Sequence, residues 1–185
     1  MRMATPGCIA VLVAANALAP AVAAAPVFHP AKSVPELALA KLLKLDDDPS
    51  AAINPSIEGA SGHRPPTKPA PNAPYLKRLT VPLATAILVA EARAVKESCG
   101  GVYKEGELCG LDADPIICGQ DSPDYYLFRT LQAGPTVAIV EAAWPPDAGK
   151  PPERSGAYRL KLDGSVWKID GISCAAGDRY NWMTR

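Results

Sequence analysis

The segment GAYRLKLDGSVWKIDGISC, residues 156–174, decides the fold of this chain. Asp163-Gly164 is a dipeptide that two-residue type I′ turns prefer, because both central residues of such a turn need positive φ. A turn at these residues pairs Leu160 with Trp167 and separates apolar from charged side chains. The apolar face then carries Tyr158, Leu160, Leu162, Trp167 and Ile169, and the charged face carries Arg159, Lys161, Lys168 and Asp170.

The alternation of the hairpin breaks after Ile169. The next large apolar residue, Ile172, follows three positions later instead of two, with Gly171 between them. A β-bulge near Asp170-Gly171 would return Ile172 to the apolar face. The sequence therefore predicts such a bulge in the last strand.

Two further strands precede the hairpin. Residues 136–144, TVAIVEAAW, are apolar on both faces apart from Glu141, which is typical of a central strand. Residues 125–132 form the strand before it, joined by a short turn at 133–135. The connection 145–155 holds four prolines and should lie outside the sheet, because proline cannot donate to a ladder. We predict a four-stranded antiparallel meander.

Two helices are predicted before these strands. Ser33 and Glu36 form a capping box at the start of a helix from 34 to about 45. Thr80 is expected to cap a second helix with its side chain, and Gly100-Gly101 to end it. The packed face of this helix is expected to carry Leu83, Ile87, Ala90, Ala94 and Val95, with Glu91, Arg93, Lys96 and Glu97 largely outside it.

The fold class expected from these elements is α+β, with a four-stranded curved antiparallel sheet packed against two or more helices. Composition and element boundaries divide the chain into five parts. They are a signal peptide (1–24), an N-terminal helix of the domain (25–47), a Pro-rich linker or loop (48–74), the α+β domain (75–174) and a C-terminal tail (175–185).

A family resemblance rests on a leading pair of helices, a D-x-D-P-then-Q-D motif and the final L-x-x-D-G-x-W-x-I-D-x-I hairpin. These features resemble the bacterial domain of unknown function 3828, over roughly residues 75–174, although Gly171 departs from the acidic or polar residue of that pattern. The resemblance implies a nuclear transport factor 2-like (cystatin-like) fold, a curved sheet around a conical cavity, an envelope location and no settled activity. The matching residues are Asp112, Asp114, Pro115, Gln120, Asp121, Leu160, Asp163, Gly164, Trp167, Ile169, Asp170 and Ile172.

The N-terminus reads as a secretory signal. Arg2 supplies a positive n-region, residues 8–19 an apolar h-region, and residues 21–25 several A-x-A-like cleavage registers. Pro26 disfavours cleavage directly after Ala25, so we expect it after residue 23 or 24. The apolar run is shorter than the ~20 residues that a membrane span needs. The mature protein is expected to be periplasmic or secreted, with no membrane span after signal cleavage.

Export accounts for the cysteines. Removal of Cys8 leaves four, and an even number in an exported domain favours two disulfides. Four cysteines allow three connectivities, of which we favour Cys99 to Cys109 and Cys118 to Cys174. No C-x-x-C pair occurs, which argues against a zinc site. We also expect no other metal and no cofactor.

The balanced charge and the missing catalytic motifs argue against several classes of function. The chain has 19 basic and 19 acidic residues, which argues against nucleic acid or an anionic membrane as main partner. His29 and His63 fall in segments expected to be disordered, where an unfixed imidazole is a poor catalyst. No G-x-S-x-G motif occurs. Clustered Asp112, Asp114 and Asp121 could bind calcium, but we favour a structural role in which they cap backbone amides of a turn.

Four side chains are the predicted ligand- or partner-binding residues, Asp121, Tyr126, Arg129 and Glu141. Arg129 and Glu141 interrupt largely apolar strands and so need a partner or solvent. A turn centred on Gly134 would place Arg129 opposite Ile139, and Glu141 diagonal to Arg129 on the same face.

The function expected from these observations is a non-enzymatic exported binding module of the cell envelope. Its partner is an unknown protein or small ligand. A role as inhibitor or immunity protein acting on a wall-degrading enzyme or toxin fits the compartment and size. The alternative is a small enzyme with a polar cavity in a nuclear transport factor 2-like fold, so catalysis stays open.

Overall fold

The computed structural model describes residues 27–44, 68, 74–101, 109–175 and 180–183. The predicted signal peptide and nearly all of the Pro-rich segment 48–74 lie outside these residues. The described elements are α1 (Val34–Leu43), the 3-10 helix η2 (Pro74–Lys77), α2 (Val81–Cys99), β1 (Leu127–Ala133), β2 (Val137–Trp144), β3 (Glu153–Asp163) and β4 (Val166–Cys174).

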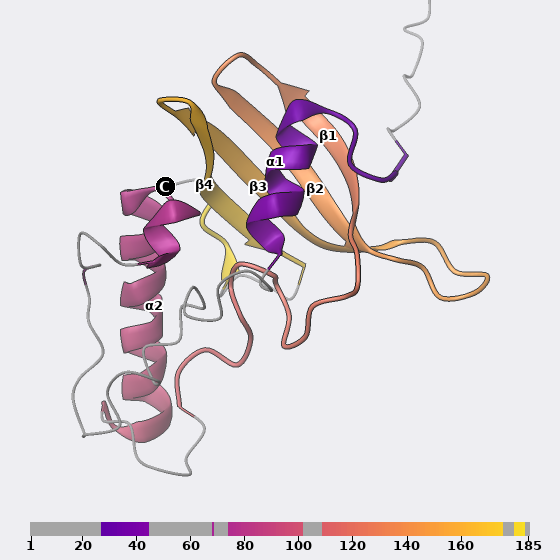
Figure 1. The fold of residues 1–185 in the computed structure, drawn as a ribbon. Coiled ribbons are helices and arrows are strands. Elements are labelled where there is room, and N and C mark those ends of the chain that lie inside the picture. The colour runs from indigo at the N-terminus through magenta and orange to yellow at the C-terminus, as the bar shows by residue number, and fades with distance from the viewer. Residues whose placement is uncertain (1–26, 45–67, 69–73, 102–108, 176–179, 184–185) are drawn as a thin grey trace, which may run out of the picture.

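The four strands form one antiparallel sheet in the order β1-β2-β3-β4, so the predicted α+β meander is confirmed. Figure 1 shows α1 lying across one face of the sheet and α2 standing beside β4. We call the face toward α1 the inner face and the opposite one the outer face. No helix among the described elements lies on the outer face.

The core fills the space between the inner face and the helices. Leu39 and Leu43 of α1 and Leu83 and Ile87 of α2 pack there, each nearly without solvent contact. Burying a side chain of this size stabilises the fold by roughly 1.5–3 kcal/mol. The sheet contributes Phe128, Ala138, Val140, Ala142, Tyr158, Leu160, Ile169 and Ile172.

The β3–β4 hairpin has the predicted faces but not the predicted register. Leu160 pairs with Ile169, two residues from the predicted partner Trp167. The turn begins one residue later than predicted, at Gly164, whose φ of 63° suits glycine at the first turn position. Because side chains alternate with a period of two, a two-residue shift leaves every side chain on its predicted face.

The predicted bulge in β4 is confirmed. Arg159 pairs with Gly171 and Leu160 with Ile169, so Asp170 is the extra residue. Its carboxylate accepts hydrogen bonds from Arg159 Nε at 3.0 Å and from the Thr80 hydroxyl at 2.9 Å. The bulge therefore joins β4 to the start of α2.

Both helix starts match the sequence, but only one has the predicted cap. Ser33 and Glu36 form the capping box of α1. Thr80 lies at the N-cap of α2 without capping it, because its hydroxyl donates to Asp170 instead. Gly100, with φ 68°, ends α2 as predicted.

One charged residue of α2 is buried against the prediction. Glu91 was expected largely outside the packed face, yet it is 7% exposed. Its carboxylate accepts a hydrogen bond from the Leu111 amide at 2.9 Å, which repays part of the desolvation. Gly110 has a positive φ of 96°, and a Cβ there would clash with the Glu91 carboxylate, so glycine is needed there.

Tyr180 and Trp182 belong to the core, although the sequence analysis placed them in a C-terminal tail. Tyr180 and Trp182 are buried and pack edge to face with ring centroids 6.1 Å apart. The Trp182 amide donates to the Ile172 carbonyl at 2.6 Å. Aromatic burial of this kind carries no periodic signal in a segment of four residues.

Two disulfides join the cysteines in the pairing that the sequence analysis favoured. Cys99 bonds to Cys109, and Cys118 bonds to Cys174. The second bond lies against β3 so closely that a Cβ at Gly156 would stand 2.8 Å from the Cys118 sulfur. Gly156 therefore gives the disulfide its space.

The two disulfides should differ in their effect on stability. They close chain separations of 10 and 56 residues. On the chain-entropy model, replacing Cys99 and Cys109 by Ala costs about 3 kcal/mol and replacing Cys118 and Cys174 about 4 kcal/mol. Urea unfolding of the oxidised proteins measures both, with each double variant as the control for the other. A larger loss for the Cys99 and Cys109 variant would contradict this account.

Candidate binding surface

Arg129 and Glu141 face each other directly across β1 and β2. The predicted diagonal arrangement, with Arg129 opposite Ile139, is wrong. The turn lies one residue later than expected, and a bulge between Thr130 and Gln132 changes the register beyond it. Arg129 Nε donates to Glu141 Oε2 in an ion-paired hydrogen bond.

A second arginine reaches the same carboxylate from β3. Arg154 Nε lies 3.3 Å from Glu141 Oε1, on the side opposite Arg129. The Glu141 side chain is only 8% exposed, whereas that of Arg154 is 41% exposed. Two guanidinium groups thus share one carboxylate on the outer face, and the cluster carries a net positive charge. We call these three residues the arginine cluster.

The N-terminal segment adds an aromatic ring to the arginine cluster. The His29 amide donates to the Phe128 carbonyl at 2.9 Å, and the Phe128 amide donates to the His29 carbonyl at 2.7 Å. Paired residues share a face, so His29 points inward with Phe128 and its neighbour Phe28 points outward. The Arg129 guanidinium lies 4.4 Å from the centre of the Phe28 ring, a cation–π contact.

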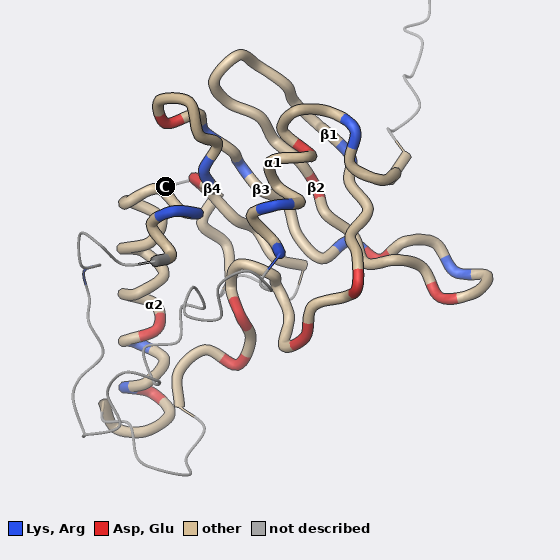
Figure 2. Tube along the Cα trace, in the orientation of Figure 1, with Lys and Arg blue, Asp and Glu red and all other residues tan. Residues whose placement is uncertain are grey.

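The rest of the outer face is also charged, and Figure 2 shows Lys and Arg positions along β3 and β4. Arg159 pairs with Asp170 at 3.0 Å, and Lys168 pairs with Asp163 at 2.8 Å. Lys161 stands opposite Lys168 on the same face. Basic residues therefore exceed acidic ones there: Arg129, Arg154, Arg159, Lys161 and Lys168 against Glu141, Asp163 and Asp170.

The loop between β2 and β3, residues 145–152, extends the sheet at the end that carries Arg154. It projects away from the body of the molecule in Figure 1. Two exposed aromatic residues flank this end of the sheet: Trp144, 37% exposed, precedes the loop, and Tyr125, 57% exposed, precedes β1, whose Leu127 pairs with Ala143. Tyr, Trp and Arg are the residues most enriched at the energetic centres of protein interfaces.

The structure does not unite the four predicted binding residues. Arg129 and Glu141 lie together on the outer face. Tyr126 packs against the core instead, with its ring 6.3 Å from Phe128. Asp121 is exposed in the loop before β1.

The acidic motif before β1 builds a turn, as the structural interpretation predicted for Asp114. Asp114 Oδ1 accepts hydrogen bonds from the amides of Ile116 at 2.6 Å and Ile117 at 3.4 Å. Asp112 differs, because it accepts the hydroxyl of Tyr180. Among the described residues no group of three or more metal-ligating side chains occurs.

Burial shifts the pKa of two side chains at this turn, Asp114 and Tyr126. Burial raises the pKa of Asp114, and the two amide bonds and the Arg78 guanidinium only partly oppose it. Burial likewise raises the pKa of Tyr126 to about 12. The buried Tyr126 hydroxyl has no hydrogen-bond partner among the described residues. The nearby Ser122 hydroxyl partly opposes the rise in the Tyr126 pKa. Tyr158 donates its hydroxyl to the Ile116 carbonyl at 2.8 Å, which ties β3 to the turn.

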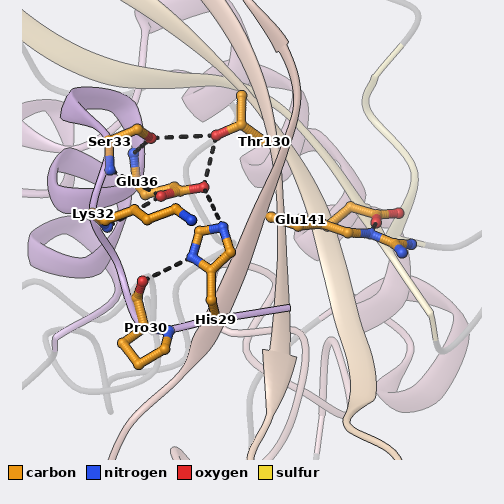
Figure 3. Close-up of polar contacts among 8 residues, drawn as sticks. His29, Pro30, Lys32, Ser33, Glu36, Thr130 and Glu141 are labelled. Carbon is orange, nitrogen blue, oxygen red and sulfur yellow. Dashed lines mark hydrogen bonds and ion pairs between the residues drawn. The ribbon is translucent and has the colours of Figure 1, made fainter. Parts of the chain in front are cut away.

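A second polar network lies under β1 on the inner face. Figure 3 shows the Glu36 carboxylate pointing at Thr130 and His29, with Glu141 lying apart from it. Glu36 Oε1 accepts the Thr130 hydroxyl at 2.8 Å and lies 3.7 Å from His29 Nε2. His29 was expected in a disordered segment, but its backbone bonds to Phe128 hold it in place. His63 lies outside the described residues.

A groove of about 800 Å³ runs along α2, away from the arginine cluster. Small side chains of α2 (Ala86, Ala90 and Ala94) line it together with Leu111 and Trp182. None of the described helices has both the length and the apolar character to cross a membrane.

Comparison with known proteins gives no relative: no family model, no curated protein and no solved structure matches the chain.

The Glu36 carboxyl should make stability depend on pH. Burial alone would raise its pKa, but hydrogen bonds from the Ser33 amide, the Thr130 hydroxyl and the Lys32 amide outweigh burial and lower the pKa below 4.5. Glu36→Gln should reduce the free energy of unfolding by roughly 1.5–3 kcal/mol at pH 7. Because the folded pKa is depressed, this difference should hold above pH 4.5 and shrink as the pH falls further.

Urea unfolding at several pH values measures this difference. The matched control is Glu97→Gln on α2, whose side chain is 61% exposed and pairs with Arg93. It should change stability by less than about 0.5 kcal/mol at any pH. A wild-type advantage over Glu36→Gln that stays constant down to pH 3 would rule out the depressed pKa.

Proposed function

We propose that this chain is an exported, non-enzymatic binding module of the cell envelope that holds a protein partner on its outer face. The arginine cluster carries the proposal. No described helix covers the outer face, and charged side chains on such a face are ordinarily exposed to solvent. Glu141 is instead buried there between two guanidinium groups. Charged groups in fixed geometry on an open face favour recognition of a partner of complementary charge.

The family assignment is part of the proposal. The antiparallel meander, the helix across its inner face and the turn built by Asp114 support membership in the domain of unknown function 3828 family, with a nuclear transport factor 2-like fold. The Asp170 bulge falls within the matching hairpin motif. Bulges curve a sheet, which suits a sheet that wraps helices.

Two further observations support export. Disulfides persist in oxidising compartments and are rare where thiols are kept reduced. The chain joins all four of its cysteines beyond the predicted signal in two bonds. The N-terminal segment has the three parts of a secretory signal, so we place the mature protein in the periplasm or outside the cell.

The alternative, a small enzyme with a polar cavity, needs its polar residues in one cavity. Tyr126, which directly precedes β1, packs against the core, whereas Arg129 of β1 lies on the outer face, so the two side chains do not share one cavity. An open face suits a protein partner better than a small molecule, because ligand pockets are concave. A binding role is therefore favoured over a catalytic one.

Inhibition of a wall-degrading enzyme or a toxin is the specific role that we propose. The outer face carries two more basic than acidic side chains. Glycoside hydrolases, a large class of such enzymes, carry a pair of carboxylates in their active-site cleft. A positively charged binding surface is complementary to such a cleft.

Arg154→Ala tests the binding role, because Arg154 is the most exposed member of the arginine cluster. Tagged mature protein, immobilised and exposed to the envelope fraction of its own organism, should retain a partner identifiable by mass spectrometry. With that partner purified, Arg154→Ala should weaken binding at least about thirtyfold, with the melting temperature unchanged. The range expected for a charged contact at an interface is about 2–5 kcal/mol.

Arg93→Ala is the matched control, since Arg93 is a 79% exposed arginine on α2, away from the outer face. It should bind the partner like the wild type. Equal binding by wild type and both variants would remove the arginine cluster from the functional account. A partner whose enzymatic activity is unaffected by saturating amounts of this protein would refute inhibition while leaving binding intact.

A further inference from the structure

We infer that the β2–β3 loop, residues 145–152, is a preformed plug that enters a concave, aromatic-lined cleft of the partner protein. This inference rests on the proposed function and adds the part of the molecule that fits the partner. We call these eight residues the prolyl loop. They are separated from Arg154 by one residue, so the loop and the arginine cluster lie at the same end of the sheet.

The prolyl loop is restricted before it meets any partner. Four of its eight residues are proline, two at each end, in the sequence PPDAGKPP. Proline fixes φ near −65° and restricts the residue before it to extended conformations. Each arm of the loop therefore has few conformations to lose on binding.

The tip of the loop is closed by its own contacts. The Lys150 amide donates to the Asp147 carbonyl at 3.0 Å, and the Lys150 ammonium donates to the Asp147 carboxylate at 3.1 Å. Gly149 supplies the positive φ of 81° that the turn requires. The two charges cancel each other, so the tip presents no net charge to a partner.

The loop does not pack on the rest of the protein. Its six central residues, 146–151, are all exposed, and Figure 1 shows the loop projecting beyond the sheet. A convex element of this kind fits a concave surface. Prolines in extended conformation bind grooves lined by aromatic side chains, because their stiff rings lose little entropy on docking. The occupant expected from this chemistry is a protein cleft with aromatic walls.

The base of the loop supplies the rest of the contact. Trp144 precedes it directly and is more than a third exposed, although its ring reaches Gly119, where a Cβ would lie 3.0 Å away. Because the Trp144 ring already rests against Gly119, it offers the rim of the cleft an apolar surface and loses little conformational freedom on binding. Trp144 alternates with Ala143, which pairs with Arg154, so the apolar contact and the charged contact of the arginine cluster lie on opposite faces at this end of the sheet.

Site-specific photo-crosslinking tests this inference in the full-length chain, expressed in its own organism. A benzophenone amino acid replaces one of three exposed residues: Ala148 at the loop tip, Lys161 on the outer face or Val89 on α2. We expect a covalent adduct from Ala148 to one envelope protein and none from Val89. Peptide mapping of that adduct should locate the crosslink in a cleft whose walls hold aromatic side chains.

The three positions separate the two proposals. An adduct from Lys161 without one from Ala148 overturns the plug and leaves binding on the outer face. No adduct from either position contradicts both. An adduct from Ala148 that maps to a convex or purely charged surface also overturns the inference.

Loosening the loop should weaken the contact without unfolding the protein. Replacing both Pro146 and Pro151 by Gly restores backbone freedom to the two arms and should reduce the affinity for the crosslinked protein about tenfold. Pro135→Gly, in the exposed β1–β2 turn at the other end of the strands, is the control and should leave the affinity unchanged. Equal affinity for the loosened loop and the wild type would contradict preorganisation.

Discussion

The bulge at Asp170 is the constraint on which the rest of the structure depends. Without the extra residue, strict alternation would turn Ile172 and Cys174 toward the outer face. With the extra residue, both lie on the inner face, where Cys174 bonds to Cys118 at the turn that Asp114 builds. The displaced Asp170 carboxylate binds Thr80 and Arg159 and so fixes the start of α2 against β4. One inserted residue thus separates an apolar inner face from a charged outer face.

Much of this fold could be predicted from local pattern. The hairpin faces, the bulge, the capping box and the local Cys99–Cys109 bond all follow from short-range rules, and the structure has each of them. The registers were less predictable, because the position of each turn decides them. A later turn start shifted the β3–β4 pairs by two residues, and the bulge near Leu131 shifted part of the β1–β2 pairing. The hairpin faces survived because a shift of two residues preserves the alternation of side chains.

The candidate surface was harder to predict, since it depends on residues far apart in the chain. Arg129 and Glu141 stand out as charges within apolar strands, and that signal is local. Arg154 and Phe28 carry no such signal: they join the cluster only through pairing of β2 with β3 and of His29 with Phe128. Thr80 and Glu91 likewise bind partners that helix periodicity does not reveal. The prolyl loop is visible in the sequence, because its paired prolines indicate a segment outside the sheet.

Hydrogen–deuterium exchange of the protein alone and bound to its purified partner tests the central claim, that the outer face and its adjoining loop are the binding surface. The account predicts slower exchange of backbone amides in residues 127–133 and 141–157, with α2 unchanged. Proline has no amide, so the signal in the loop would come from residues 147–150. Protection confined to α2 and the groove beside it, with the outer face unchanged, would contradict the account and move the binding surface to the other side of the molecule.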